Sequence, residues 1–552
     1  ITGSGYLSED QLEDDKNRIK QFLLDKGLLD AKVSKPVVKR KKDGLEVVFF
    51  VDEGKQYKIG EITASGDLID NSVEKTISGI KIKKGDVFSV SAVRRATFKI
   101  SEKYGDLGYA FANVIPQTRV DKLNALVDLN FLIDKGKKVK INRIEISGNT
   151  KTYDYVIRRE LEIAEQEQYS LSKINRSKAL LRRLGYFDEV NINTKPVGED
   201  KVDLEVRVKE GPTGSFSIGG GFSSTEGLIF TSRISENNFL GMGYRLVASV
   251  DIGNRSDNFI LSFENRRLYN SYLSLSTDAF VTKREFSDFD RKLKGGALGF
   301  GYPFERWFTE STYFKDVRGS IKYRYLRVTI DNVNPEDAAP FVIESQGTTT
   351  ASAIIPEIVR NTVDNPLDPT EGSKQDLSLE LAGPGGNARY YLAEFRHRQY
   401  YPLLKTSRGP IVFSWRGIVG FGDSFKKGEK LPLFKRFFPG GINSIRGFKS
   451  RTLGPKDEKG NEFGGSKEVI GNFELIFPIA TRIRLKGIVF YDLGQAFDDG
   501  ESITVGALRH AAGFGFRWFS PLGPIRIEFG IPLDRQEGES KVVTQFSFGS
   551  PL

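Results

Sequence analysis

Two patterns of apolar and polar residues divide the chain near residue 213. Before that point, stretches with apolar residues at helical spacing alternate with stretches in which every second residue is apolar. After it, the helical spacing disappears, and short alternating segments rich in Tyr and Phe follow one another between Gly, Asn, Asp and Pro. The pattern predicts an α+β region followed by an all-β region.

The first region contains a repeat of about eighty residues. Two sets of glycines recur at this spacing, one at predicted helix ends and one after predicted closing strands: Gly27, Gly108 and Gly185, and Gly54, Gly136 and Gly211. Each complete unit reads strand, helix, helix, strand, strand (β-α-α-β-β), which predicts a small module with one exposed sheet face. We expect complete modules at residues 56–136 and 137–212.

Residues 1–55 match only the later part of this repeat, so we expect a partial module without its opening strand and first helix. The chain begins at Ile1, with neither an initiator Met nor a charged-then-apolar leader. We therefore expect a processed or trimmed product, cut inside a module, with more copies upstream.

Residues 213–552 predict a roughly sixteen-stranded antiparallel transmembrane β-barrel, because about 340 residues at about twenty per strand and loop make about sixteen strands. In "GPIRIEFGIPL", Ile525, Ile527 and Phe529 share one face, and Arg526 and Glu528 share the other. Such alternation hides a membrane strand from hydropathy averages. A soluble sandwich or propeller is the alternative, but sandwiches are seldom so long and no blade repeat is found.

Composition excludes several kinds of chemistry. The 552 residues include no Cys, one Met and two His, which excludes disulfides, thiolate metal sites and cysteine nucleophiles. The net charge of +10 is small against 82 basic and 72 acidic residues, and no nucleic-acid-binding motif accompanies it. We expect no nucleic-acid partner, catalytic residue, metal site or cofactor.

Six motifs then follow one another in a characteristic order: "ENNFLGMG" (236–243), "RNTVDNPLDPTEGS" (360–373), "FFPGGINSIRGF" (437–448), "GNFELIFP" (471–478), "VFYDLGQAF" (489–497) and "GFGFRWFSPLGPIRIEFGIPL" (513–533). Together with the repeat, they resemble the BamA-type outer-membrane protein insertion porins, in which periplasmic POTRA repeats precede a C-terminal barrel. The sequence departs from that family in two respects. Ile445 replaces the usual Val, and two repeats and a fragment stand where five are usual.

The segment Ile445, Arg446, Gly447 and Phe448 is a candidate site. An arginine in so apolar a setting predicts a guanidinium in an enclosed place, where it needs a carboxylate partner. A solvated loop arginine is the alternative. The resemblance implies that this segment lies on a long extracellular loop that folds into the barrel lumen.

The same resemblance implies that Arg446 pairs with Asp492, with Glu474 close by. Strand alternation independently turns Asp492 and Glu474 inward, because a carboxylate that faces lipid is costly. Removing one partner of such a buried pair would strand the other charge.

"SFSIGGGFSS" and "VVTQFSFGSPL" are the predicted first and last barrel strands, which must meet to close the barrel. Glycine inside a strand weakens packing, so we predict a weak lateral seam that can expose strand edges to an added strand. Its candidate residues are Phe216, Gly219, Gly220, Gly221, Phe546, Phe548 and Gly549.

The expected protein is a non-enzymatic assembly factor of the bacterial outer membrane, with its POTRA modules in the periplasm. It would fold and insert unfolded β-barrel clients into outer-membrane lipid through the seam, while the POTRA modules receive clients and bind accessory lipoproteins. The alternatives are a two-partner-secretion or translocation-assembly transporter of the same superfamily, or a passive porin.

Overall fold

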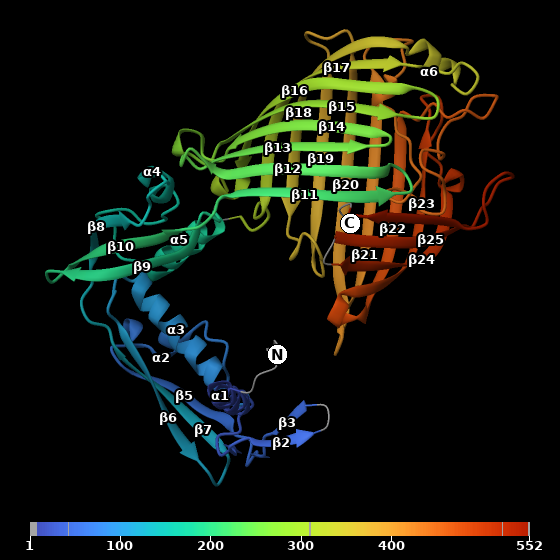
Figure 1. Ribbon diagram of the computed structural model, residues 1–552. Coiled ribbons are helices and arrows are strands. Elements are labelled where there is room, and N and C mark those ends of the chain that lie inside the picture. Colours follow the sequence, from blue (N-terminus) through green and yellow to red (C-terminus); the bar gives the residue numbers. More distant parts are fainter. Residues whose placement is uncertain (1–7, 42–43, 309–310, 521–522, 550–552) are drawn as a thin grey trace. The chain divides into compact units, whose positions relative to one another are not determined.

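The computed structural model describes residues 8–41, 44–308, 311–520 and 523–549 (Figure 1). The chain divides into two compact units, Ile1–Gly211 and Pro212–Leu552. The first unit contains small β-sheets packed with helices, and the second is a closed barrel of sixteen strands. The predicted fold class, α+β modules followed by a sixteen-stranded antiparallel barrel, is confirmed.

The first unit contains three successive repeats. In the first, helix α1 precedes two small antiparallel sheets, β1 with β4 and β2 with β3. The bounds are α1 Glu9–Asp25, β1 Lys32–Val33, β2 Val37–Lys41, β3 Gly44–Val48 and β4 Val51–Asp52.

The second and third repeats each have two helices and a three-stranded sheet. The sheet orders are β5-β7-β6 and β8-β10-β9, in which the first pair is parallel and the second antiparallel. The bounds in the second repeat are β5 Lys58–Gly66, α2 Val73–Ile77, α3 Val90–Asp106, β6 Asn113–Asp121 and β7 Leu126–Asp134. Those in the third are β8 Lys140–Ser147, α4 Asp154–Arg158, α5 Leu171–Arg183, β9 Phe187–Val197 and β10 Lys201–Glu210.

Strand alternation builds the core of each complete repeat. In β7, Val127, Leu129 and Phe131 are almost fully buried, whereas the residues between them are partly exposed. They pack in one cluster with Ile100 and Tyr104 of α3. Each of the two complete repeats therefore has its own core between helices and sheet, and the other sheet face stays accessible.

Neighbouring repeats are joined by an aspartate at the end of one helix and two serines at the start of the next repeat's helix. Asp25, at the end of α1, accepts hydrogen bonds from the Ser89 hydroxyl (2.9 Å) and from the Ser91 backbone N–H (2.8 Å) and hydroxyl (2.7 Å). Ser89 is also the N-cap of α3. The equivalent residues at the next joint are Asp106, Ser170 and Ser172.

The barrel runs from β11 to β26, each strand antiparallel to its neighbours, and β26 closes on β11. The bounds are β11 Gly214–Ser223, β12 Gly227–Phe239, β13 Tyr244–Gly253, β14 Ser256–Asn265, β15 Ser274–Glu285, β16 Asp290–Pro303, β17 Val317–Asp331 and β18 Gly347–Asn361. They continue with β19 Gly372–Ala382, β20 Tyr390–Thr406, β21 Gly409–Ser424, β22 Lys467–Ala480, β23 Leu485–Phe497, β24 Arg509–Ser520, β25 Gly523–Pro532 and β26 Val543–Phe548. A short helix, α6 Pro340–Glu344, lies between β17 and β18.

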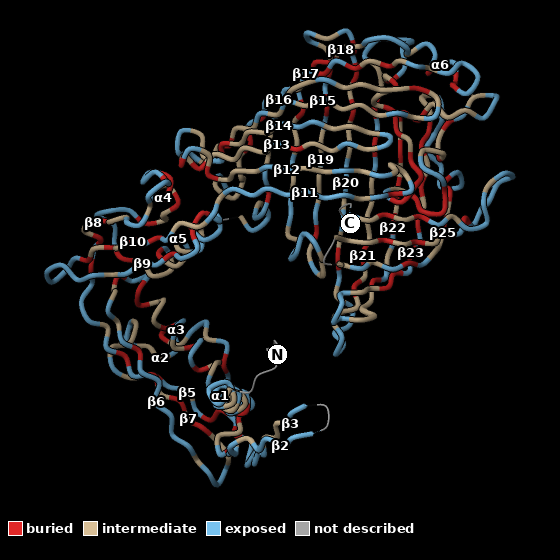
Figure 2. The backbone as a smooth tube through the Cα atoms, in the orientation of Figure 1, coloured by how far each residue is buried: buried red, intermediate tan, exposed pale blue. Residues whose placement is uncertain are grey.

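The barrel wall has the alternation of a membrane strand. In β17, the exposed Ile321, Tyr323 and Tyr325 alternate with Lys322 and Arg324, as expected for apolar residues outside and polar residues inside. Figure 2 shows that buried residues of the barrel gather near β22 to β25. Within the described ranges, no helix is both long and apolar enough to cross a membrane.

Glu210, at the end of β10, binds the loop after β8. Its carboxylate accepts hydrogen bonds from the backbone N–H groups of Thr150 (3.1 Å), Lys151 (2.9 Å) and Thr152 (2.7 Å), and from the Thr150 hydroxyl (2.7 Å). Burial raises the pKa of Glu210, but the hydrogen bonds from Thr152 and Thr150 outweigh it and lower that pKa to about 2.

We expect Glu210→Gln to lower the free energy of unfolding of the first unit by about 1 to 2 kcal/mol at pH 7, after allowance for partial exposure. Because folding lowers this pKa, the stabilisation is complete above the usual pKa of Glu and is lost as the pH falls toward about 2. Urea unfolding of the whole chain, followed by helical circular dichroism, should show that the difference between wild type and variant narrows over this range.

Glu199, which is 85% exposed in its side chain, provides the matched control. Glu199→Gln should change stability little at any pH. A difference for Glu210→Gln that stays constant with pH would show that the carboxylate charge contributes nothing there.

Candidate functional site in the barrel interior and at its seam

The loop between β21 and β22, residues 425–466 and hereafter the inner loop, carries the predicted segment. Ile445, Arg446 and Phe448 are 0%, 3% and 3% exposed. Ile445 and Phe448 pack in one apolar cluster with Ile470 of β22 and Ala511 of β24. The segment is therefore held against the inner wall of the barrel.

Gly447 permits this close approach of loop and wall. Its φ is +89°, and a Cβ there would lie 2.8 Å from the Ala511 Cβ. Opposite it, a Cβ at Gly530 of β25 would lie 2.2 Å from the Gly447 nitrogen. Two glycines thus let the two backbones touch where any other residue would separate them.

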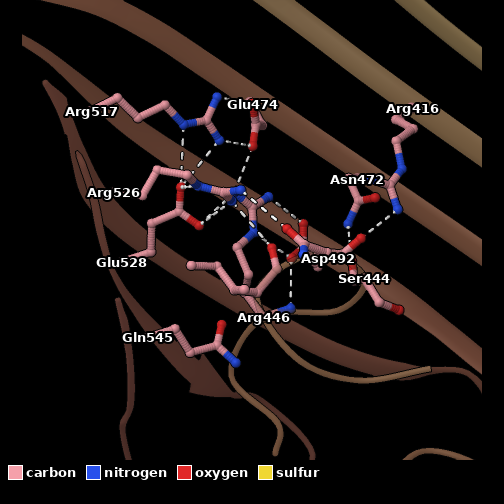
Figure 3. Close-up of polar contacts among 12 residues, drawn as sticks. Arg416, Ser444, Arg446, Asn472, Glu474, Asp492, Arg517, Arg526, Glu528 and Gln545 are labelled. Carbon is pink, nitrogen blue, oxygen red and sulfur yellow. Dashed lines mark hydrogen bonds and ion pairs between the residues drawn. The ribbon is translucent and has the colours of Figure 1, made fainter. Parts of the chain in front are cut away.

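Arg446 is surrounded by carboxylates (Figure 3). Its Nε and Nη2 donate to the two oxygens of Asp492, both at 2.7 Å, and its backbone N–H donates to Asp492 Oδ2 at 2.9 Å. Nη1 donates to Glu474 at 2.5 Å and to Glu528 at 3.4 Å. The guanidinium also lies 3.7 Å from the ring centre of Phe490, a cation–π contact.

Two more arginines complete the cluster. Arg517 of β24 donates to Glu474 at 2.6 Å and to Glu528 at 3.1 Å, and Arg526 of β25 donates to Glu528 at 2.8 Å. Three arginines therefore face three carboxylates, so the charges balance. This arginine–carboxylate network consists of Arg446, Arg517, Arg526, Glu474, Asp492 and Glu528.

The structure thus brings together Arg446, Asp492 and Glu474, the three residues singled out in the sequence. Glu528 and Arg517 were not assigned to the site. Alternation in "GPIRIEFGIPL" placed Glu528 and Arg526 on one face, but the contact between Arg446 and Glu528 joins residues 82 apart in sequence. A local sequence pattern does not predict a contact between residues so far apart in the chain.

A second set of contacts holds the first part of the inner loop. Lys435 donates to Glu380 of β19 at 2.7 Å, and Arg324 of β17 pairs with the same carboxylate at 2.5 Å. The neighbouring Arg436 pairs with Asp498, after β23. The inner loop is therefore attached to opposite parts of the barrel wall.

The seam between β11 and β26 is narrow. Only two pairs of residues face each other across it in the described part of the chain, Phe222 with Phe548 and Ser223 with Ser547. One further hydrogen bond runs from the Ser224 N–H to the Phe546 carbonyl at 3.0 Å. By contrast, β11 pairs with β12 along its whole length.

Glycines line the rest of the contact. A Cβ at Gly221 would lie 2.5 Å from the Phe548 carbonyl oxygen, and one at Gly549 would lie 2.7 Å from the Gly220 carbonyl oxygen. Side chains at these positions would force the strands apart.

Of the predicted seam residues, Gly220, Gly221, Phe546, Phe548 and Gly549 lie at this contact. Phe216 and Gly219 lie on the part of β11 that has no described partner in β26. Phe222, Ser223 and Ser547 were not assigned to the seam from the sequence, because the register between distant strands was needed to find them.

Across the described ranges, no group of His, Cys, Asp and Glu side chains is arranged to hold a metal ion. The two histidines make aromatic contacts: His397 stacks on Trp415 at 4.2 Å, and His510 Nδ1 lies 2.7 Å from the Tyr491 hydroxyl.

Comparison with known proteins gives matches along the whole chain. The sequence model of the Omp85 superfamily domain matches residues 238–551, and the POTRA model, described as a surface antigen variable number repeat, matches residues 1–54, 57–136 and 139–211. Outer membrane protein assembly factor BamA of Nitratidesulfovibrio vulgaris is 31% identical over 556 residues, which cover 98% of this chain and 67% of that protein. The protein of the same name from Neisseria meningitidis is 27% identical, and the alignment covers 100% of this chain and 74% of that protein.

A solved structure shares the fold. The crystal structure of BamA from Haemophilus ducreyi lacking POTRA domains 1–3 superposes with a TM-score of 0.70 at 24% identity, and covers 90% of this chain and 100% of that one.

We expect Arg446→Ala to destabilise the barrel by about 3 to 5 kcal/mol, because it strands buried carboxylates. Asp492→Asn should cost less, since Arg446 keeps Glu474 and Glu528 as partners. The double variant should be no less stable than Arg446→Ala alone, because it removes one stranded charge. Urea unfolding followed by tryptophan fluorescence measures all three.

The exposed Arg482, between β22 and β23, supplies a control: Arg482→Ala should leave the unfolding midpoint almost unchanged. Fully additive losses for Arg446→Ala and Asp492→Asn would contradict an energetic coupling between the two residues.

Proposed function

Because the chain belongs to the BamA family of outer membrane protein assembly factors, within the Omp85 superfamily, we propose that it folds and inserts β-barrel clients at the seam between β11 and β26. The observation that carries this proposal is the narrow pairing of these two strands, which among the residues that the structure describes is limited to Phe222 with Phe548 and Ser223 with Ser547. Each hydrogen bond contributes a net stabilisation of about 1 kcal/mol. Separating such a short ladder therefore costs little free energy.

An opened seam would present strand edges to a client. The stretch of β11 from Gly214 to Gly219 already has no described partner in β26, and its main-chain groups can pair with an added strand. Gly219, Gly220 and Gly221 would let that strand approach closely. The free energy would come from folding of the client into outer-membrane lipid, so the mechanism needs no catalysed reaction or cofactor.

The inner loop supports insertion at the seam over passage through the lumen. The arginine–carboxylate network and the pair of Lys435 with Glu380 hold this loop inside the barrel. The alternatives would need the barrel interior for passage of a client or solute instead. These alternatives are a two-partner-secretion transporter, a translocation-assembly transporter and a passive porin.

The POTRA repeats would act in the periplasm of a bacterium with an outer membrane. We propose that they receive unfolded clients and bind accessory lipoproteins. Two edge strands, β6 and β9, support this role. Each lies at the end of a three-stranded sheet, and within the described ranges one side of each is unpaired. Edge strands accept peptide strands.

A disulfide across the seam tests the proposed mechanism. Ser223 and Ser547 are directly opposite and are 8% and 5% exposed. Since the next position, Ser224 with Phe546, carries a hydrogen bond, Ser223 and Ser547 form a non-hydrogen-bonded pair, where side chains are closest. We expect Ser223→Cys with Ser547→Cys to lose client insertion on oxidation and to regain it on reduction.

Insertion is measured as the heat-dependent gel mobility of a urea-unfolded outer-membrane barrel added to liposomes that contain the whole chain. The matched control joins β11 to β12 through Ser215→Cys and Ser235→Cys, whose native hydroxyls are 2.8 Å apart, and it should insert clients in both redox states. Undiminished insertion by a fully cross-linked seam would rule out the lateral mechanism. Liposome conductance far above background in the wild type would instead favour the porin.

A further inference from the structure

A row of polar residues crosses four neighbouring strands inside the barrel. The strand registers place Arg398 of β20 opposite Arg416 of β21, Arg416 opposite Asn472 of β22, and Asn472 opposite Asp492 of β23. Asp492 binds Arg446 of the inner loop. The two ends of this row thus differ: one holds a matched ion pair, and the other holds two adjacent arginines.

Among the residues that the structure describes, the two arginines lack a negative partner. Throughout the described residues, neither Arg398 nor Arg416 lies within ion-pair distance of a carboxylate. Arg416 Nη2 donates to the Asn443 carbonyl oxygen at 2.8 Å, but its Nε is buried with no hydrogen-bond partner. Like charges directly opposite on neighbouring strands are destabilising, so this pair is incomplete as it stands.

Both arginines line a cavity of about 470 Å³ inside the barrel. The other charged groups around it are matched: Arg446, Arg517 and Arg526 belong to the balanced network, and Lys486 pairs with Asp368 at 2.5 Å. The excess positive charge of the cavity therefore comes from Arg398 and Arg416.

We propose that Arg398 and Arg416 bind a phosphate group in this cavity, either as inorganic phosphate or on a small headgroup. A phosphate with a charge of about −1.5 to −2 matches two guanidinium groups, whereas one carboxylate matches only one. Its oxygens can accept from two guanidinium forks at once. The volume lies within the roughly 300–1,000 Å³ typical of small-ligand sites.

Asn472 adds a further contact for such a ligand. Figure 3 shows Asn472 beside Arg416. Its amide nitrogen donates to the Ser444 carbonyl of the inner loop at 2.7 Å, and its Oδ1 is buried without a partner. This oxygen can accept a hydrogen bond from a protonated phosphate oxygen or from a headgroup hydroxyl or ammonium. A bound phosphate would then link the barrel wall to the tip of the inner loop.

Calorimetric titration of the whole chain, in a phosphate-free sugar detergent, tests the site. The probes are inorganic phosphate and glycerol 3-phosphate. We expect saturable binding of at least one, weakened about tenfold or more by Arg398→Gln and by Arg416→Gln. Arg416→Lys, which keeps the charge but loses the fork, should weaken binding less than Arg416→Gln does.

Arg408→Gln, at an exposed turn between β20 and β21, changes the charge equally and should bind as wild type does. Heat-dependent gel mobility identifies the variants that have folded. Tighter binding of glycerol 3-phosphate identifies a headgroup ligand, and equal or weaker binding identifies free phosphate. The proposal is overturned if neither probe binds the wild type, or if the two glutamine variants bind as Arg408→Gln does. Neither result bears on insertion at the seam.

Discussion

A buried guanidinium needs negatively charged partners. The partners of Arg446 determine how the inner loop and several strands are arranged inside the barrel. Its partners Glu474, Asp492 and Glu528 come from β22, β23 and β25. Each carboxylate faces inward only in the observed register, because a slip of one residue would turn it toward the outside of the barrel. The position of the inner loop and the register of three strands therefore depend on one another.

The described contacts are distributed unevenly around the barrel wall. From β21 to β25, long strand ladders are reinforced by ion pairs and by the apolar contacts of Ile445 and Phe448. Beyond β25, the last strand β26 is short, and in the part of the chain that the structure describes it pairs with β11 at two positions. In the proposed mechanism, opening at β26 would leave the arginine–carboxylate network in place, since no carboxylate or arginine of that network lies on either seam strand.

Local patterns in the sequence were sufficient to predict the kind of fold and the inward faces of the strands that carry Glu474 and Asp492. The glycine spacing predicted the repeats, and alternation in "VFYDLGQAF" and "GNFELIFP" turned Asp492 and Glu474 inward. The same alternation placed Arg526 and Glu528 on one face, but it could not show that they meet Arg446, because that meeting depends on how a long loop folds back. The pairing of Ser223 with Ser547 was equally inaccessible, since it is set by barrel closure over more than 300 residues.

The aspartate joint between repeats is a head-to-tail contact. The second repeat carries Ser89 and Ser91 at one end and Asp106 at the other, so the two surfaces differ and the contact does not close on itself. An interface of this kind lets a unit be duplicated or lost while every remaining junction keeps the same chemistry. The third repeat departs from the series, because Arg183 stands two residues before Gly185, where the earlier repeats have Asp25 and Asp106. The third repeat thus lacks, at this position, the acid that binds the two serines at each of the earlier junctions.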